Sequence, residues 1–152
     1  MIHEEMPIGV KFAVIHRAFR RELDAALREK DLTGAQYGAL RALDYLERER
    51  GGEISQRDIE EVSHSAHPTM TEILKKLERK GFIETRPSET DRRRKQIRQT
   101  EKARELSRDM FRVDDQTYAK FCAGLDREQR ADLESMLETL LHNACGSCEK
   151  EE

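Results

Sequence analysis

The stretch from Ile54 to Thr100 decides the fold, and it reads ISQRDIEEVSHSAHPTMTEILKKLERKGFIETRPSETDRRRKQIRQT. Its apolar spacing and its polar breaks predict two helices, a tight turn between them, and two short extended segments around an arginine-rich tip. In chain order, the helix, turn, helix and two extended segments are expected at residues 56–62, 63–65, 67–80, 82–85 and 95–98.

The second predicted helix has one apolar stripe and one polar face. The stripe follows the spacing of an amphipathic helix: Met70, Ile73, Leu74 and Leu77. We expect Ser65 to cap this helix, Pro68 to be tolerated in its first turn, and Gly81 to end it. The residues away from the stripe are free to contact a partner.

Basic charge is concentrated in the same stretch. Between Lys75 and Arg98 there are ten basic and four acidic side chains, a net charge of +6, whereas the whole chain carries −3. A positive patch in an otherwise acidic protein indicates a polyanionic partner. A solvated basic loop would explain the charge but not its position after two helices and between two strands. We therefore predict a winged helix-turn-helix that binds DNA.

Three motifs in and around this stretch resemble the multiple antibiotic resistance regulator (MarR) family. One is Leu-x-x-Leu-x-x-x-Gly-Phe-Ile at residues 74–83, and another is Asp-x-Arg at residues 91–93, before the second strand. A third is Leu-Thr-x-x-Gln-Tyr-x-x-Leu at residues 32–40. The sequence departs from the family's pattern after the wing, where Gln99 replaces a leucine and Ala103 replaces a glycine.

The resemblance implies a mainly α-helical, dimeric fold of six helices with a small β-wing. Residues 1–152 would form one domain, with the winged helix-turn-helix at 33–99 and dimerisation helices at 1–32 and 100–146. The composition agrees with this, because 39% charged against 36% apolar residues favours long amphipathic helices that pair in a dimer. The outer helices are expected at residues 7–30, 33–48, 100–123 and from 126 onward.

Local signals predict where several helices begin. Thr33 with Gln36, and Asp126 with Gln129, have the spacing of capping boxes. Ser55 is expected to cap the first helix of the stretch, with Asp58 in its first turn, and Thr100 to cap the helix after the wing. Residues 53–55 are expected to add a short strand to the wing.

The residues expected to contact DNA lie at the start of the first helix, on the polar face of the second, and at the wing tip. Histidine and threonine suit base edges, proline and threonine methyls suit a thymine methyl, and arginine suits phosphates or a narrow minor groove. Asp91 is expected to orient Arg93 or the wing turn. The full set is Gln56, Arg57, Ser65, His67, Pro68, Thr69, Thr71, Lys75, Asp91, Arg92, Arg93, Arg94 and Lys95.

The resemblance implies a homodimeric transcriptional regulator that represses from a pseudo-palindromic operator. A two-fold dimer would place its two reading helices about 34 Å apart, in successive major grooves. A small-molecule effector would enter a crevice between the dimer helices and the winged unit. Side chains expected to line such a crevice are Phe12, His16, Arg20 and Tyr37.

The cysteines leave an alternative open. Cys145 and Cys148 form a CxxC motif with His142 three residues before it, which could bind Zn²⁺ or form a redox-responsive disulfide in a regulator of the same fold. One CxxC without a second pair favours a reduced tail, so we expect no metal or cofactor. Cys122 is expected to be a small core residue.

No spacing in the chain indicates an enzyme: there is no glycine-rich phosphate loop and no nucleophile–histidine–carboxylate pattern. The first residues lack an apolar segment and no apolar run approaches 18 residues, so we expect a cytoplasmic protein with no membrane partner. A winged-helix module used for protein contacts stays open as a different class of function.

Overall fold

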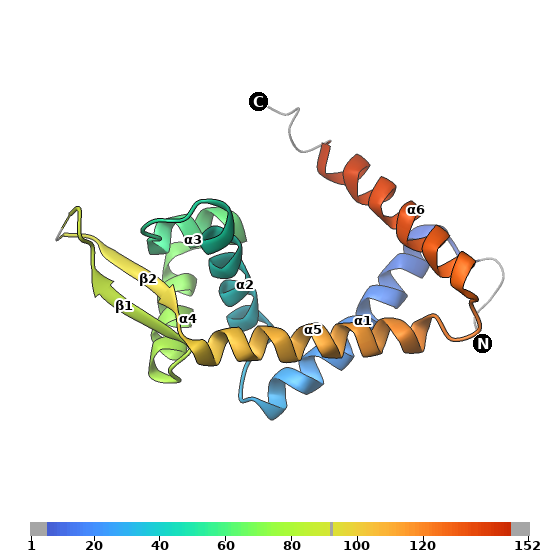
Figure 1. Cartoon of the computed structure of the whole chain (residues 1–152), viewed down its shortest axis with the longest axis horizontal. Coiled ribbons are helices and arrows are strands. Elements are labelled where there is room, and N and C mark those ends of the chain that lie inside the picture. The colour runs from blue at the N-terminus through green and yellow to red at the C-terminus, as the bar shows by residue number, and fades with distance from the viewer. Residues whose placement is uncertain (1–5, 92, 147–152) are drawn as a thin grey trace. The chain divides into compact units, whose positions relative to one another are not determined.

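The computed structural model describes residues 6–91 and 93–146, and the chain divides within its fifth helix into two compact units, Met1–Asp115 and Gln116–Glu152. Six helices and one two-stranded antiparallel sheet form in the described residues, which confirms the predicted six helices and small β-wing (Figure 1). The elements are α1 (Ile8–Glu29), α2 (Gly34–Glu49), α3 (Gln56–Ser63), α4 (His67–Arg79), β1 (Ile83–Pro87), β2 (Lys95–Gln99), α5 (Glu101–Phe121) and α6 (Arg127–Gly146).

Reciprocal caps begin three of the helices where the sequence predicts them. The Thr33 hydroxyl accepts from the backbone N–H of Gln36 at 3.2 Å, and the Gln36 side chain accepts from the N–H of Thr33 at 3.1 Å. Ser55 and Asp58 form the same box at α3, and Asp126 and Gln129 form it at α6. Each box pairs two N–H groups that the first helical turn leaves without partners.

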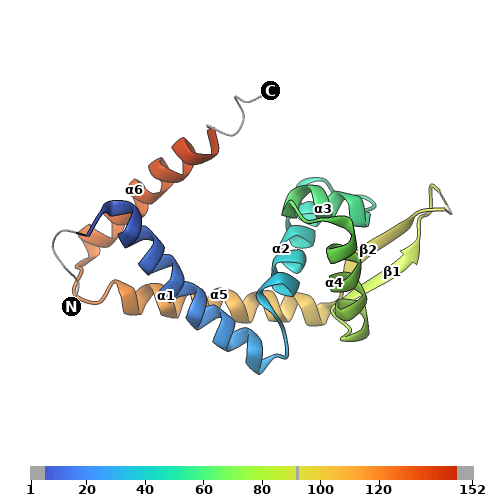
Figure 2. The same ribbon diagram turned by 180° about the vertical axis from the view of Figure 1, so that it is seen from behind.

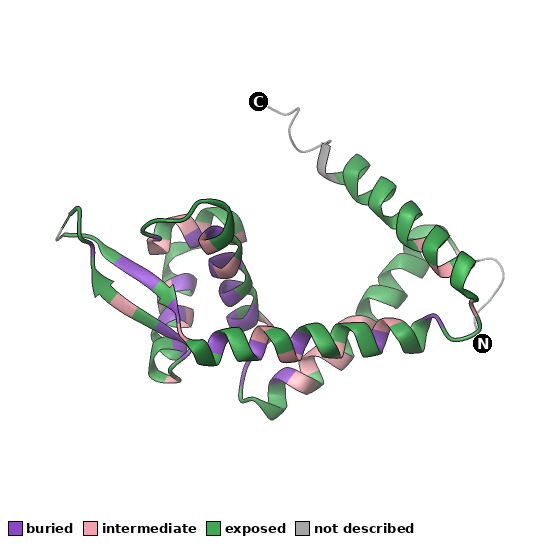
Figure 3. Ribbon diagram, in the orientation of Figure 1, coloured by how far each residue is buried: buried purple, intermediate pink, exposed green. Residues whose placement is uncertain are grey.

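The core of the first unit lies between α2, the two helices after it, and the sheet. Views from opposite sides show α2, α3 and α4 grouped beside the β1–β2 ribbon (Figures 1 and 2). Figure 3 shows the buried positions concentrated on their facing sides. The largest fully buried side chains of this unit are Leu27, Leu40, Leu43, Leu46, Ile59, Met70 and Leu77. Burial of each of these side chains stabilises the fold by roughly 1.5–3 kcal/mol, and so holds α4 firmly in place.

The wing is the two-stranded sheet and the loop that joins its strands. Register runs from Ile83 opposite Gln99 to Pro87 opposite Lys95. The expected third strand at residues 53–55 is wrong: these residues lie outside the sheet, and one backbone bond, from Ile97 N–H to the Ile54 carbonyl at 2.7 Å, joins them to β2. The segment is too short to pair further, because two glycines with positive φ precede it and Ser55 already begins α3.

Ser65 does not cap α4, contrary to the prediction. The N-cap residue is Ala66, which has no side-chain acceptor, and the Ser65 hydroxyl donates instead to the Ser63 carbonyl at 3.3 Å. Helix α4 begins at His67 as predicted, so Ala66 occupies the cap position and Ser65 lies one residue before it. His64, at the C-cap of α3, adopts the left-handed conformation, with φ at 49°. Thr100 does precede α5, and its hydroxyl donates to the carbonyl of Gly81 at 2.7 Å.

The outer helices expose apolar side chains. In the first unit, α1 exposes large apolar residues between Ile8 and Ile15, and only Leu27 on it is buried. In the second unit, Cys122 is buried as expected, whereas nearly all of the described α6 is exposed (Figure 3). The exposed large apolar residues of the two helices are Ile8, Val10, Phe12, Val14, Ile15, Met136, Leu137, Leu140 and Leu141. Among the described residues, no helix combines the length and the apolar character needed to cross a membrane.

Candidate nucleic-acid interface

Helix α4 presents a polar face opposite its buried stripe. Met70, Leu74 and Leu77 point into the core, and the residues between them are exposed or half-buried. The predicted contact residues His67, Pro68, Thr69 and Lys75 are exposed, and Thr71 is half-buried. The helix therefore offers the face that the sequence assigned to a partner.

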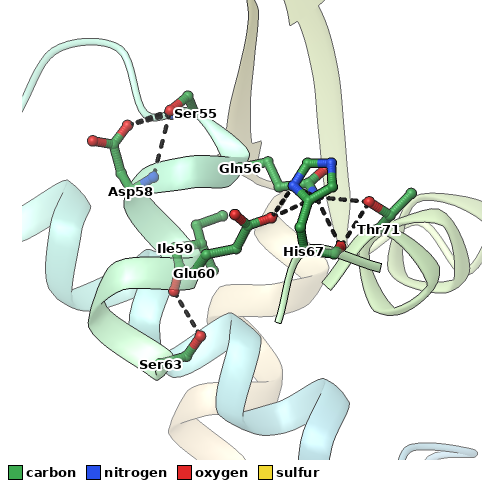
Figure 4. A network of polar contacts seen from close by, with 8 residues as sticks. All are labelled: Ser55, Gln56, Asp58, Ile59, Glu60, Ser63, His67 and Thr71. Atoms are coloured by element: carbon green, nitrogen blue, oxygen red, sulfur yellow. Dashed lines mark hydrogen bonds and ion pairs between the residues drawn. The ribbon is translucent and has the colours of Figure 1, made fainter. Parts of the chain in front are cut away.

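A hydrogen-bond network joins this face to α3 (Figure 4). The Gln56 amide donates to Glu60 Oε1 and to Thr71 Oγ1, each at 2.7 Å. His67 Nδ1 lies 2.7 Å from the same Glu60 oxygen, and the Thr71 hydroxyl donates to the His67 carbonyl at 2.9 Å. Glu60, which was not predicted, thus bonds to two of the predicted DNA contacts, Gln56 and His67, and Thr71 joins the network through those two.

The loop of the wing is held by Glu53 and Ser88. The Glu53 carboxylate accepts from the Ser88 hydroxyl, the Glu89 N–H and the Thr90 hydroxyl. The bond from Ser88, with the backbone bond from Glu89, holds the pKa of Glu53 below its usual value. Ser88 is buried, and its oxygen also accepts from the N–H groups of Thr90 at 3.2 Å and Asp91 at 3.0 Å.

The cations of the wing tip point to solvent. Arg93, Arg94 and Lys95 are all exposed, and in the described part of the chain no ion pair holds them. Asp91 accepts from the backbone N–H of Arg93 at 3.0 Å. This bond shapes the wing turn, which is one of the two roles expected for Asp91. Arg92 lies outside the described residues.

An open groove of about 410 Å³ lies between α3, α4 and the wing. Leu74 and Ile97 form part of its lining, and cationic side chains come from all three elements. Six of the predicted contacts line it together: Gln56, Arg57, Thr71, Lys75, Arg94 and Lys95. Ser65 and Thr69 lie elsewhere, beside a hollow lined by α2 and α4 residues.

Residues 30–94, which span α2, α3, α4 and most of the wing, match the family model described as MarR family. Over this segment the chain is therefore similar to the MarR family.

Solved MarR-family structures share the fold over nearly their whole length. A structure of MarR matches with a TM-score of 0.77 and 22% identity, over 99% of both chains. The reduced form of MarR from E. coli matches with a TM-score of 0.75 and 22% identity, over 91% of this chain and 99% of that one. A mutant of S. aureus MepR bound to an oligodeoxyribonucleotide matches with a TM-score of 0.70 and 24% identity, over 92% and 99%.

The four residues expected to line an effector crevice have different surroundings in the structure. Phe12 and His16 are exposed on α1, and Arg20 is half-buried and pairs with Asp24 at 3.3 Å. Tyr37 is buried in α2, and burial raises its pKa. Arg20 lines a hollow on α1 whose lining includes none of the other three residues, so the crevice stays a prediction.

Most of the CxxC motif near the C-terminus lies outside the described residues. His142 is exposed near the end of α6, while the Cys145 side chain and Cys148 lie outside the described residues. Within the described part of the chain, no group of three histidine, cysteine, aspartate or glutamate side chains is placed to hold a metal ion.

The sequence did not reveal two acidic residues that organise the candidate interface, Glu53 and Glu60. Glu60 follows Gln56 by four residues, a spacing at which helix side chains meet, so that pair could have been found. No comparable signal marks Glu53, because its partner Ser88 is 35 positions away and depends on how the wing folds back.

Proposed function

We propose that this chain is a DNA-binding transcriptional regulator that acts as a homodimer on a pseudo-palindromic operator. The observation that carries the proposal is the groove between α3, α4 and the wing, where the exposed cations gather. Cations on a preformed groove attract phosphates, and a helix with free polar side chains suits the major groove. The oligonucleotide bound to a structurally similar MepR mutant supports the same use.

The residue roles follow from their positions. Thr71 and His67 on α4 would face base edges, with Pro68 and Thr69 beside them. Residues at the start of α3, on α4 and on the wing would contact phosphates: Gln56, Arg57, Ser65, Lys75, Arg92, Arg94 and Lys95. Gln56 would do so through its backbone N–H in the first turn of α3, because its side-chain amide already donates to Glu60 and Thr71. Arg93 would enter the flanking minor groove, and Asp91 would keep the wing turn in shape for it.

The exposed apolar residues on α1 and on α6 support the homodimer. Phe12 and Ile15 are each 49% exposed, and Leu141 is 58% exposed. Apolar surface of this kind on several successive turns of a helix marks a protein–protein contact. We propose that residues 1–32 and 100–146 form the dimer interface, while residues 33–99 bind DNA as part of one domain.

Regulation by a small molecule is part of the proposal. Binding between the dimer helices and the winged unit, near Phe12, His16, Arg20 and Tyr37, would change the spacing of the two reading helices and so release the operator. Release of the operator would relieve repression, so we propose that the chain is a repressor. A chain that acts on genomic DNA in this way would work in the cytoplasm.

Selection of bound fragments from a pool of random duplexes tests the proposal. We expect an enriched motif with two-fold symmetry and half-sites about ten base pairs apart. Failure to retain any duplex at low salt would overturn the proposal and favour a winged-helix module for protein contacts. Repeating the selection after mild oxidation, or with a Zn²⁺ chelator, tests a redox or metal-binding role for Cys145 and Cys148. Unchanged DNA binding would exclude that role.

A further inference from the structure

Glu60, on α3, lies beside the polar face of α4 that the proposed function assigns to DNA. Its side chain is only 15% exposed, while the His67 ring beside it is 74% exposed. One oxygen, Oε1, lies 2.7 Å both from the Gln56 amide nitrogen and from His67 Nδ1 (Figure 4). A shielded carboxylate thus contacts two side chains that extend toward solvent from two different helices.

The 2.7 Å contact decides which nitrogen of His67 carries the proton. An ionised carboxylate only accepts hydrogen bonds, so Nδ1 must be the donor to Glu60. Gln56 Nε2 lies 3.3 Å from the same Nδ1 and cannot bond to it, because both atoms are then donors. The Gln56 amide instead donates its two hydrogens to Glu60 and Thr71.

This assignment fixes what the ring offers a partner. With the proton on Nδ1, Nε2 of a neutral ring is an acceptor. In the major groove an acceptor matches the amino groups of adenine and cytosine, and it is mismatched to N7 and O6 of guanine, which are acceptors themselves. The opposite tautomer would reverse this preference.

We propose that Glu60 is a positioning residue that sets the base preference of His67 by fixing its tautomer. The inference rests on the proposed function, since it needs α4 to lie in the major groove. Glu60 itself would not touch DNA. It would act through His67, and would keep Gln56 and Thr71 in register with the ring.

Random-duplex selection at about pH 8.5, where a histidine ring is ordinarily neutral, tests the proposal with four variants and the wild type. In the wild type, one position of each half-site should favour adenine or cytosine, and H67A should remove that preference. E60A should relax the preference at that same position by roughly tenfold, the scale of one well-formed base contact. E60Q, whose amide oxygen still accepts from Nδ1, should retain it. E61A, a change at the adjacent exposed glutamate, is the matched control and should behave as the wild type.

A double-mutant cycle separates positioning from simple destabilisation. E60A should leave the preference unchanged in an H67A background, because the ring through which it acts is absent. The proposal is overturned if E60A lowers affinity equally for all duplexes, or if its effect on preference persists without His67. A wild type that retains no duplex at low salt would instead refute the proposed function, so the two failures are distinguishable. Thermal melting of each variant confirms that it is folded.

Discussion

Replacing Glu47 by alanine should destabilise the fold through the junction after the wing. Glu47 is a half-buried residue of α2 whose carboxylate accepts from the backbone N–H of Gln99 at 2.9 Å and from the Gln99 amide at 3.2 Å. Gln99 is only 5% exposed, so without Glu47 its backbone N–H loses its acceptor in a site closed to water. The Gln99 amide keeps only the longer bond to Asp44, at 3.3 Å.

The size of the effect follows from these two bonds. Leaving a buried donor unpaired costs about 1–3 kcal/mol, and loss of a bond to a charged group adds a comparable amount, so we expect a loss of about 3 kcal/mol. For a chain of this length that corresponds to a fall of roughly 6–12 °C in the unfolding midpoint. Arg104 lies 3.9 Å from Glu47 and is half exposed, so its share of the loss is small.

Urea unfolding followed by circular dichroism, at one fixed protein concentration, measures this loss for E47A. E49A, two residues further along the same helix and exposed, is the matched control and should change stability by less than about 0.5 kcal/mol. Equal stability of E47A and E49A would show that Glu47 does not hold the Gln99 junction, and would refute the reasoning.

Three further predictions concern the wing and the start of α3. Arg93→Ala should weaken DNA binding and make the salt dependence shallower by about 0.9 if a phosphate contact is lost; binding titrations at several salt concentrations measure both, and unchanged affinity in a folded variant would remove Arg93 from the interface. Ser88→Ala removes the hydroxyl that holds the wing loop and should weaken binding about fivefold while leaving the salt slope unchanged, because every cation remains; a changed slope in the same titrations would contradict this. Burial raises the pKa of Asp58, but the hydrogen bonds from Ser55 and Arg50 outweigh burial and hold the pKa below its usual value. The ionised carboxylate therefore stabilises the fold above about pH 4, and that stability is lost as the pH falls further. Asp58→Asn should therefore be less stable than the wild type at neutral pH and should lose less stability between about pH 5 and pH 2. Urea unfolding at several pH values measures both, and an equal loss of stability in the two proteins over that range would argue against the role of Asp58.

The sequence predicted those features that depend on near neighbours in the chain. The capping boxes at Thr33, Ser55 and Asp126 involve residues three positions apart, and the stripe of α4 repeats within two turns. Such features are decided by local spacing, so one sequence suffices. The same holds for the order of helix, turn, helix and wing that the structure confirms.

Features that depend on the path of the chain were not predictable in the same way. The strand expected at residues 53–55 does not form, because two glycines with positive φ precede it and Ser55 already begins α3. Ser65 misses the cap position of α4 because α4 begins at His67, which leaves Ala66 at that position. Glu60 meets His67 only across the turn between α3 and α4.

Gln99 shows how a departure from the family's pattern is accommodated. A buried glutamine at that position needs polar partners, and α2 supplies the carboxylates of Asp44 and Glu47. The sequence marked Gln99 as unusual but gave no indication of these partners, which lie more than 50 positions earlier in the chain. Polar bonds from α2 therefore hold Gln99 in the junction after the wing.

The central claim is that two copies of the groove between α3, α4 and the wing bind one DNA duplex. Sedimentation of the chain with a duplex obtained by selection tests this most directly, using the selected spacing and one lengthened by five base pairs. We predict two chains on the selected duplex and a large loss of affinity for the lengthened one, because the second half-site is then turned half a helical turn away. One chain per duplex, with affinity indifferent to spacing, would contradict the claim.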